Sequence, residues 1–155
     1  MWEVAQGSST LVGRVLLVLI FLLSALGNKI PNFSATAEQM AANGVPLPKV
    51  ALVGAIVFLI LGSLSIIVGY KARYGAALLL IFLIAASFYF HDFWSYAPDT
   101  HYILSTDRMI RRQVAQMELI HFMKNMALMG AMLIIMANGS GVMSLDNWHP
   151  KEKNP

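Results

Sequence analysis

The sequence contains four apolar runs that are each long enough to cross a lipid bilayer as a helix. A transmembrane helix needs about 20 consecutive, mostly apolar residues. The composition agrees, because 57% of the residues are hydrophobic and only 12% are charged, whereas about a quarter are charged in soluble domains. We therefore predict an all-α integral membrane protein, a four-transmembrane-helix bundle that forms one domain over residues 1–155. The predicted spans cover residues of about 11–27, 50–70, 74–92 and 118–137, followed by a tail at 138–155.

An even number of spans places both termini on the same side of the membrane, which we call the near side. The link between the second and third spans also lies there, and it is short and carries Lys71 and Arg73. Basic residues in short loops favour the cytoplasmic side. We therefore predict cytoplasmic termini in the plasma (inner) membrane of a bacterium or an archaeon.

The two longer connections lie on the opposite side of the membrane, the far side. The first contains "ATAEQMAANG", which predicts a short amphipathic helix that ends at Gly44, because glycine commonly follows the last turn of a helix. The second offers residues 105–107 as N-caps, and from there a helical pattern continues through Ala137. We expect the first turns of this long fourth helix to stand outside the lipid.

Several function classes are excluded by what the sequence lacks. It has no cysteine, so disulfides, thiol relays, iron–sulfur clusters and zinc–thiolate sites are ruled out. It contains no phosphate-binding loop, dinucleotide-binding turn or nucleophile elbow. The positive charges form no basic stripe with interleaved aromatic residues, so we predict no nucleic-acid partner and no nucleotide cofactor.

Polar residues gather near the far-side ends of three of the four predicted spans. Ionisable groups are costly in the lipid core, so they tend to face the bundle interior and to pair with one another. Glu118, His121 and Asn125 are spaced three and four residues apart, which places them on one face of the fourth span. We predict a pocket between the first, third and fourth spans that opens to the far side. The polar residues near it are Asn28, Lys29, His91, Asp92, Glu118, His121, Lys124 and Asn125.

The same residues fit simpler interpretations. Asp92 and Lys29 stand where helices leave the lipid, and the long side chains of Lys124 and Arg14 can snorkel to the membrane surface. A hydrogen-bonded network that only fixes helix packing is an equal alternative. The Glu-x-x-His spacing at residues 118–121 is used in di-iron bundles, which need it twice together with two further carboxylates. It occurs once here, so we predict no metal site.

Four stretches of the sequence form an ordered set of motifs that covers nearly the whole chain. They are "GRVLLVLIFLLSALGNKI" (13–30), "AANGVPLP" (41–48), "HDFW" (91–94) and "QMELIHFMKNMALMGAMLII" (116–135). In this set the sequence resembles the DoxX family of small four-helix membrane proteins. It departs from the family pattern in having "GNK" and "GAM" where members often have Gly-x-x-Lys and Gly-Gly-x. The positions that match family motifs are Arg14, Lys29, His91, Trp94, Lys124 and Asn125.

The resemblance implies a membrane four-helix bundle and a link to quinone chemistry, because the family takes its name from the membrane subunit of an archaeal thiosulfate:quinone oxidoreductase. We therefore predict a membrane subunit of a redox system that holds a quinone or a similar flat apolar molecule. His91 or Lys124 would hydrogen-bond a carbonyl oxygen, Trp94 would stack on the ring, and Asp92 or Glu118 would pass protons. The catalytic candidates are His91, Asp92, Glu118 and His121, and the ligand-binding candidates are Arg14, Lys29, Trp94, Lys124 and Asn125.

The alternative function is that of a non-catalytic accessory or assembly subunit in a larger membrane complex. The small size of the chain and its lack of cofactor motifs fit this hypothesis, so the sequence leaves open whether the protein is an enzyme. A third hypothesis is a carrier of a lipid or a small solute, although the broken helices common in transporters are not evident in the sequence. In all three hypotheses the partners are membrane lipids and other protein subunits or a second copy of the chain. Electrons for any quinone reaction would have to come from such a partner.

Overall fold

The computed structural model describes residues 2–91, 93 and 105–148. In this part of the chain every regular element is a helix and no strand is present. Four stretches are long and apolar enough to cross a membrane: Gln6–Lys29, Pro48–Val68, Ala72–Phe90 and Met109–Asn138. The predicted fold class is thus confirmed. The elements are α1 (Trp2–Ser24), the π-helical turn η1 (Ala25–Lys29), α2 (Phe33–Ala42), α3 (Pro48–Val68), α4 (Ala72–Phe90), α5 (Ser105–Asn138) and α6 (Leu145–Trp148).

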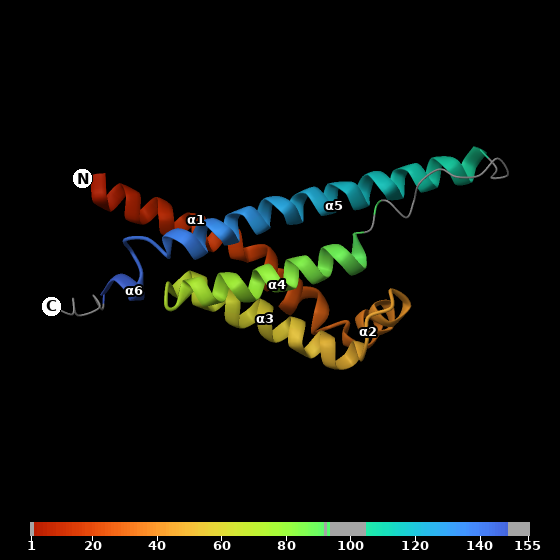
Figure 1. Ribbon diagram of the computed structural model, residues 1–155, viewed down its shortest axis with the longest axis horizontal. Coiled ribbons are helices and arrows are strands. Elements are labelled where there is room, and N and C mark those ends of the chain that lie inside the picture. The colour runs from red at the N-terminus through yellow and green to blue at the C-terminus, as the bar shows by residue number, and fades with distance from the viewer. Residues whose placement is uncertain (1, 92, 94–104, 149–155) are drawn as a thin grey trace.

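The ends of the helices differ from the ends of the predicted spans. The third span was predicted to continue to residue 92, but α4 ends at Phe90 because the backbone of His91 leaves the helical region (φ −125°, ψ 49°). The fourth helix was predicted to start near residues 105–107 and to run through residue 137, and α5 covers Ser105–Asn138. At about 1.5 Å per residue it is roughly 51 Å long, well beyond a hydrocarbon core of about 30 Å. Figure 1 shows its first turns extending past the end of α4.

The short far-side helix predicted from the first long connection is α2. Gly44 follows it in a left-handed conformation (φ +75°), and the N–H of Val45 donates to the carbonyl of Met40 at 3.0 Å, which closes the last turn. On its inner face Ala37 and Met40 pack against Leu52 of α3. These contacts place α2 against the far-side end of the bundle.

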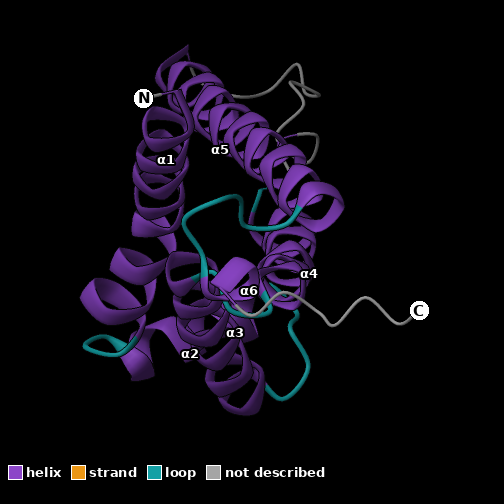
Figure 2. Ribbon diagram, turned by 90° about the vertical axis from the view of Figure 1, so that its left-hand side faces the viewer, coloured by secondary structure: helices purple, strands orange, loops and turns teal. Residues whose placement is uncertain are grey.

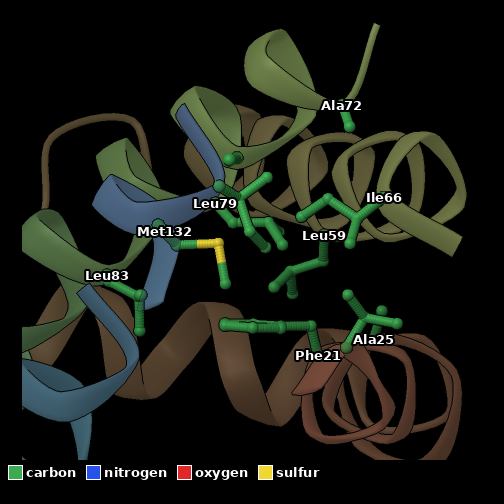
Figure 3. Close-up of a cluster of buried hydrophobic side chains, with 11 residues drawn as sticks. Phe21, Ala25, Leu59, Ile66, Ala72, Leu79, Leu83 and Met132 are labelled. Carbon is green, nitrogen blue, oxygen red and sulfur yellow. The ribbon is translucent and has the colours of Figure 1, made fainter. Parts of the chain in front are cut away.

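The long helices pack in the order α1, α3, α4 and α5, with α3 in contact with both α1 and α4 and with α4 in contact with α5. The backbones of α3 and α4 approach each other closely, since a Cβ atom added to Gly62 would be 2.9 Å from the carbonyl oxygen of Gly75. Small residues permit such an approach of two helix backbones. Side chains from all four helices then meet in one core, in which Phe21 of α1 and Met132 of α5 project into the same space (Figure 3).

The near-side end of the bundle is covered by residues 139–148, which were predicted only as part of a tail. α1 begins at the same end of the bundle at which α6 lies (Figure 1), and Figure 2 views the molecule from there. The carboxylate of Asp146 accepts hydrogen bonds from the N–H groups of Lys71 (2.9 Å) and Ala72 (3.3 Å). A negative charge and its oxygens at a helix N-terminus satisfy free N–H groups there, so Asp146 caps α4.

Candidate functional site

A pocket of about 370 Å³ lies at the far-side end of the bundle. It is where the sequence predicted one, between the first, third and fourth spans, although α2 and α3 also contribute to its wall. Its volume falls in the range of about 300 to 1,000 Å³ that is usual for small-molecule sites. The apolar wall includes Phe21, Leu52, Phe82, Tyr89, Phe90 and Leu128, and the polar wall includes Ser24, Asn28, Lys29, Thr36, Gln39, His91, Lys124 and Asn125.

Lys29 reaches the pocket from the π-helical turn η1 that ends α1. In an α-helix, residues five apart differ by about 140° around the axis, whereas a π turn bonds residues five apart and brings them to one face. The ammonium of Lys29 accordingly donates to the hydroxyl of Ser24, five residues earlier, at 2.8 Å. It also lies 5.6 Å from the ring centroid of Phe82 on α4, a cation–π contact. No feature of the sequence indicated this π turn.

His91 joins the end of α4 to α5. Because its backbone has left the helix, its Nδ1 lies 2.7 Å from a carboxylate oxygen of Glu118. The two side chains are 21% and 23% exposed, so the pair is shielded from water but not buried. The imidazole ring also stacks on that of His121, with centroids 5.2 Å apart. His91 lines the pocket, whereas Glu118 and His121 lie behind it and hold its ring.

Lys124 lies one turn after His121 on α5 and also lines the pocket. Its ammonium is 3.2 Å from Nδ1 of His121. An ammonium only donates hydrogen bonds, so Nδ1 of His121 is the acceptor in this contact. The four side chains of His91, Glu118, His121 and Lys124 therefore form a continuous chain of contacts, which we call the far-side cluster.

Asn125 is 5% exposed and links two helices. Its amide donates to the hydroxyl of Ser87 on α4 at 3.1 Å. A hydrogen bond of this kind between spans supports helix association, so Asn125 has a packing role in addition to its place on the pocket wall. The spacing of Ser87, four residues before His91 in a helical run, could have placed it on the same face from the sequence.

Arg14 lies at the opposite end of the bundle and does not line this pocket. It is 4% exposed, so the interpretation in which it snorkels to the membrane surface is wrong: the side chain points into the protein. Its guanidinium donates to the carbonyl of Met143, and its Nε and Nη1 have no partner among the described residues. A ligand-binding role of Arg14 stays a prediction, separate from the pocket. Asp92 and Trp94, also predicted as site residues, lie outside the described residues.

Taken together, the span count, the packing order and the polar far-side pocket define a small four-helix integral membrane protein. Residues 9–92 match the model of the DoxX family, and the chain belongs to that family. The chain is 27% identical over 136 residues to the inner membrane protein YphA of Escherichia coli strain K12, which covers 88% of this chain and 86% of YphA. It is 28% identical over 136 residues to the inner membrane protein YqjF of the same organism, with 88% of each chain covered. No solved structure matches the chain.

The family match covers only some of the residues of the candidate site. The family match includes Lys29 and His91 but ends before α5, which supplies Glu118, His121 and Lys124. Both relatives are named only as inner membrane proteins. The comparisons therefore establish the family and are consistent with a location in the plasma membrane. Any ligand or reaction has to be inferred from the residues of the pocket.

Proposed function

We propose that this protein is a membrane subunit of a redox system and holds a quinone or a similar flat apolar molecule in the far-side pocket. The observation that carries the proposal is the composition of the pocket wall. Aromatic and aliphatic side chains form most of it, and His91, Lys29 and Lys124 add hydrogen-bond donors to the wall. A quinone needs this combination, since its ring is apolar and flat and its carbonyl oxygens accept hydrogen bonds.

The far-side cluster supplies the groups that proton transfer requires. A quinol loses protons when it is oxidised, and a histidine beside a carboxylate is suited to accept one near neutral pH. His91 would face the ligand, and Glu118 would orient its ring and stabilise the imidazolium form. The chain offers no redox cofactor site of its own in the described residues, so electrons would pass to or from a partner subunit.

The first test is native mass spectrometry of the protein, extracted gently from its own membrane. We expect a bound mass that matches a quinone, and we expect His91→Ala to lose that mass while its thermal unfolding curve stays close to that of the unaltered protein. Lys49→Ala is the matched control, because Lys49 is exposed on the same side and lies outside the pocket wall. An empty pocket together with stoichiometric co-purifying chains would contradict the quinone proposal and favour an accessory or assembly subunit.

The proposal also includes an orientation, with the termini in the cytoplasm and the pocket open to the outer face. The chain has no cysteine, so a single cysteine can report the side. We expect a membrane-impermeant maleimide to label Lys49→Cys in intact cells and not to label Tyr70→Cys, whose position is exposed in the near-side link between α3 and α4. The reverse pattern would place the pocket at the cytoplasmic face.

A further inference from the structure

The pocket wall carries positive charge without a matching negative one. Lys29, Lys124 and His91 all line it, and none of the residues on its described wall is an aspartate or a glutamate. The nearby carboxylate of Glu118 is paired with His91. The described wall of the pocket therefore carries two ammonium groups and no carboxylate.

The hydrogen-bond partners of the two lysines are a hydroxyl and an imidazole, and neither is a carboxylate. Lys29 donates to the hydroxyl of Ser24 and lies over the ring of Phe82. Lys124 contacts the imidazole of His121. Among the residues whose side chains the structure describes (6–91, 93 and 109–148), the pair of His91 and Glu118 is the one ion pair within 4.0 Å. Lys29 is half-buried and Lys124 is exposed. Neither ammonium group is paired with a carboxylate among the residues whose side chains are described, so both can gain an anionic partner.

The rest of the pocket wall limits what that partner can be. Phe21, Phe82 and Phe90 with neighbouring aliphatic side chains give a surface on which a flat ring packs well. Inorganic anions would leave this apolar surface empty. A ligand that satisfies both parts carries an apolar ring and one ionised oxygen that reaches Lys29 or Lys124.

We propose that the pocket prefers flat apolar ligands with one ionised acidic oxygen, of the hydroxyquinone or aromatic carboxylate type, over neutral ligands of the same shape. Lys29 and Lys124 are the residues that confer this preference, because their ammonium groups face the pocket without a carboxylate partner. The inference rests on the proposed function, in that it takes the pocket as the binding site for a flat ring. It goes further by naming the charge of the ligand.

The test compares two probes that differ in charge and little else. The hydroxynaphthoquinone lawsone is ionised at neutral pH, and its methyl ether is neutral. Binding of each to the full-length protein is measured by calorimetry in nanodiscs of phosphatidylcholine alone, and protein-free nanodiscs correct for partition into lipid. We expect lawsone to bind at least about tenfold more tightly than the ether, the gain that a single charge-assisted contact can supply.

Variants then assign the preference to residues. Lys29→Met and Lys124→Met remove the charge and keep most of the side-chain volume, and we expect each to reduce the ratio of the two affinities several-fold. Lys49→Met removes a lysine from the same side of the membrane but outside the pocket wall, and we expect it to leave the ratio unchanged. Thermal unfolding of each variant in the same nanodiscs identifies any variant that does not fold. Because each lysine is replaced in a separate variant, the two residues are tested independently.

The outcomes separate this inference from the proposed function. Equal affinity of the unaltered protein for both probes would overturn the charge preference and leave the quinone pocket standing. Binding of neither probe would overturn both. A preference for lawsone that survives in the two lysine variants would overturn the assignment to Lys29 and Lys124.

Discussion

The two ends of the bundle use polar residues in opposite ways. At the near side the carbonyl of Gly69 accepts hydrogen bonds from the backbone N–H of Asp146 (2.9 Å) and from the hydroxyl of Ser140 (3.3 Å). At the far side Lys29 and Lys124 line a pocket, and their hydrogen-bond partners are a hydroxyl and an imidazole rather than a carboxylate. The near-side groups are satisfied by the protein itself, and the far-side groups have capacity left for a ligand.

The comparison indicates where stability and function are concentrated. Tight packing and satisfied hydrogen bonds fix the near side, since a buried polar group with its partners in place stabilises the fold and leaves nothing to bind. Arg14 is the exception at that end, because two of its nitrogens lack a described partner. We therefore expect near-side substitutions to change stability first and far-side substitutions to change ligand binding first.

The largest effect is expected for Gly69→Ala. Gly69 has a φ of +70°, and a Cβ atom there would overlap Nη1 of Arg14 and Cβ of Ser144 and lie 3.0 Å from Cα of Ser144. The left-handed conformation alone costs about 1 to 2 kcal/mol for a non-glycine residue, and crowding adds about 1 to 3 kcal/mol. We expect a large fall in the unfolding free energy, measured by denaturant titration in mixed micelles.

Gly44→Ala is the matched control for this substitution. Gly44 has a similar φ of +75°, but a Cβ atom there would meet nothing within 4 Å. It should therefore show the cost of the backbone conformation without the cost of crowding. If the two alanine variants unfold alike, the near-side end is less tightly packed than the structure describes, and the contrast between the ends fails.

A smaller loss is expected for Asp146→Ala. The substitution leaves the N–H groups of Lys71 and Ala72 without their acceptors at the start of α4. Loss of a helix cap costs about 0.5 to 2 kcal/mol. Asp146→Asn keeps one acceptor oxygen and should lose roughly half as much, and both variants should bind the probes like the unaltered protein. A change in probe affinity without a change in unfolding would show that the two ends are coupled.

The contrast between the ends also explains what the sequence predicts and what it does not. Lipid imposes a strong constraint on helix length and polarity, so the four helices, the long α5 and the short α2 with Gly44 were predicted correctly. The helical spacing on α5 and the positions of Lys29 and His91 also indicated a polar pocket at the far side. These features can be predicted from the sequence because the residues on one face of a helix recur with a fixed period.

Other features depend on contacts between distant segments, which local patterns do not reveal. The cap that Asp146 places on α4 joins residues more than 70 positions apart. The π turn that directs Lys29 toward Ser24 has no marker in the sequence. The inward orientation of Arg14 depends on Met143, a residue of the segment that was predicted only as a tail.

At the far side, Asn125→Leu tests how much the pocket wall contributes to stability. The substitution removes the hydrogen bond to Ser87 and leaves that hydroxyl without its partner. Hydrogen bonds between membrane helices contribute about 0.6 kcal/mol on average, so we expect a loss near that value. A double-mutant cycle with Ser87→Ala measures the coupling directly. A coupling free energy near zero would show that this bond does not hold α4 and α5 together.

The smallest change in stability is expected for Glu118→Gln. The ion pair with His91 is partly exposed, and such pairs contribute only about 0 to 1 kcal/mol. The amide oxygen of glutamine can still accept a hydrogen bond from His91, so the ring keeps its orientation.

Removing the one paired carboxylate makes the far-side cluster more positive. We therefore expect nearly unchanged unfolding, nearly unchanged affinity for the neutral ether, and a few-fold gain in affinity for lawsone. A loss of affinity for lawsone would mean that Glu118 contributes to binding through something other than its negative charge.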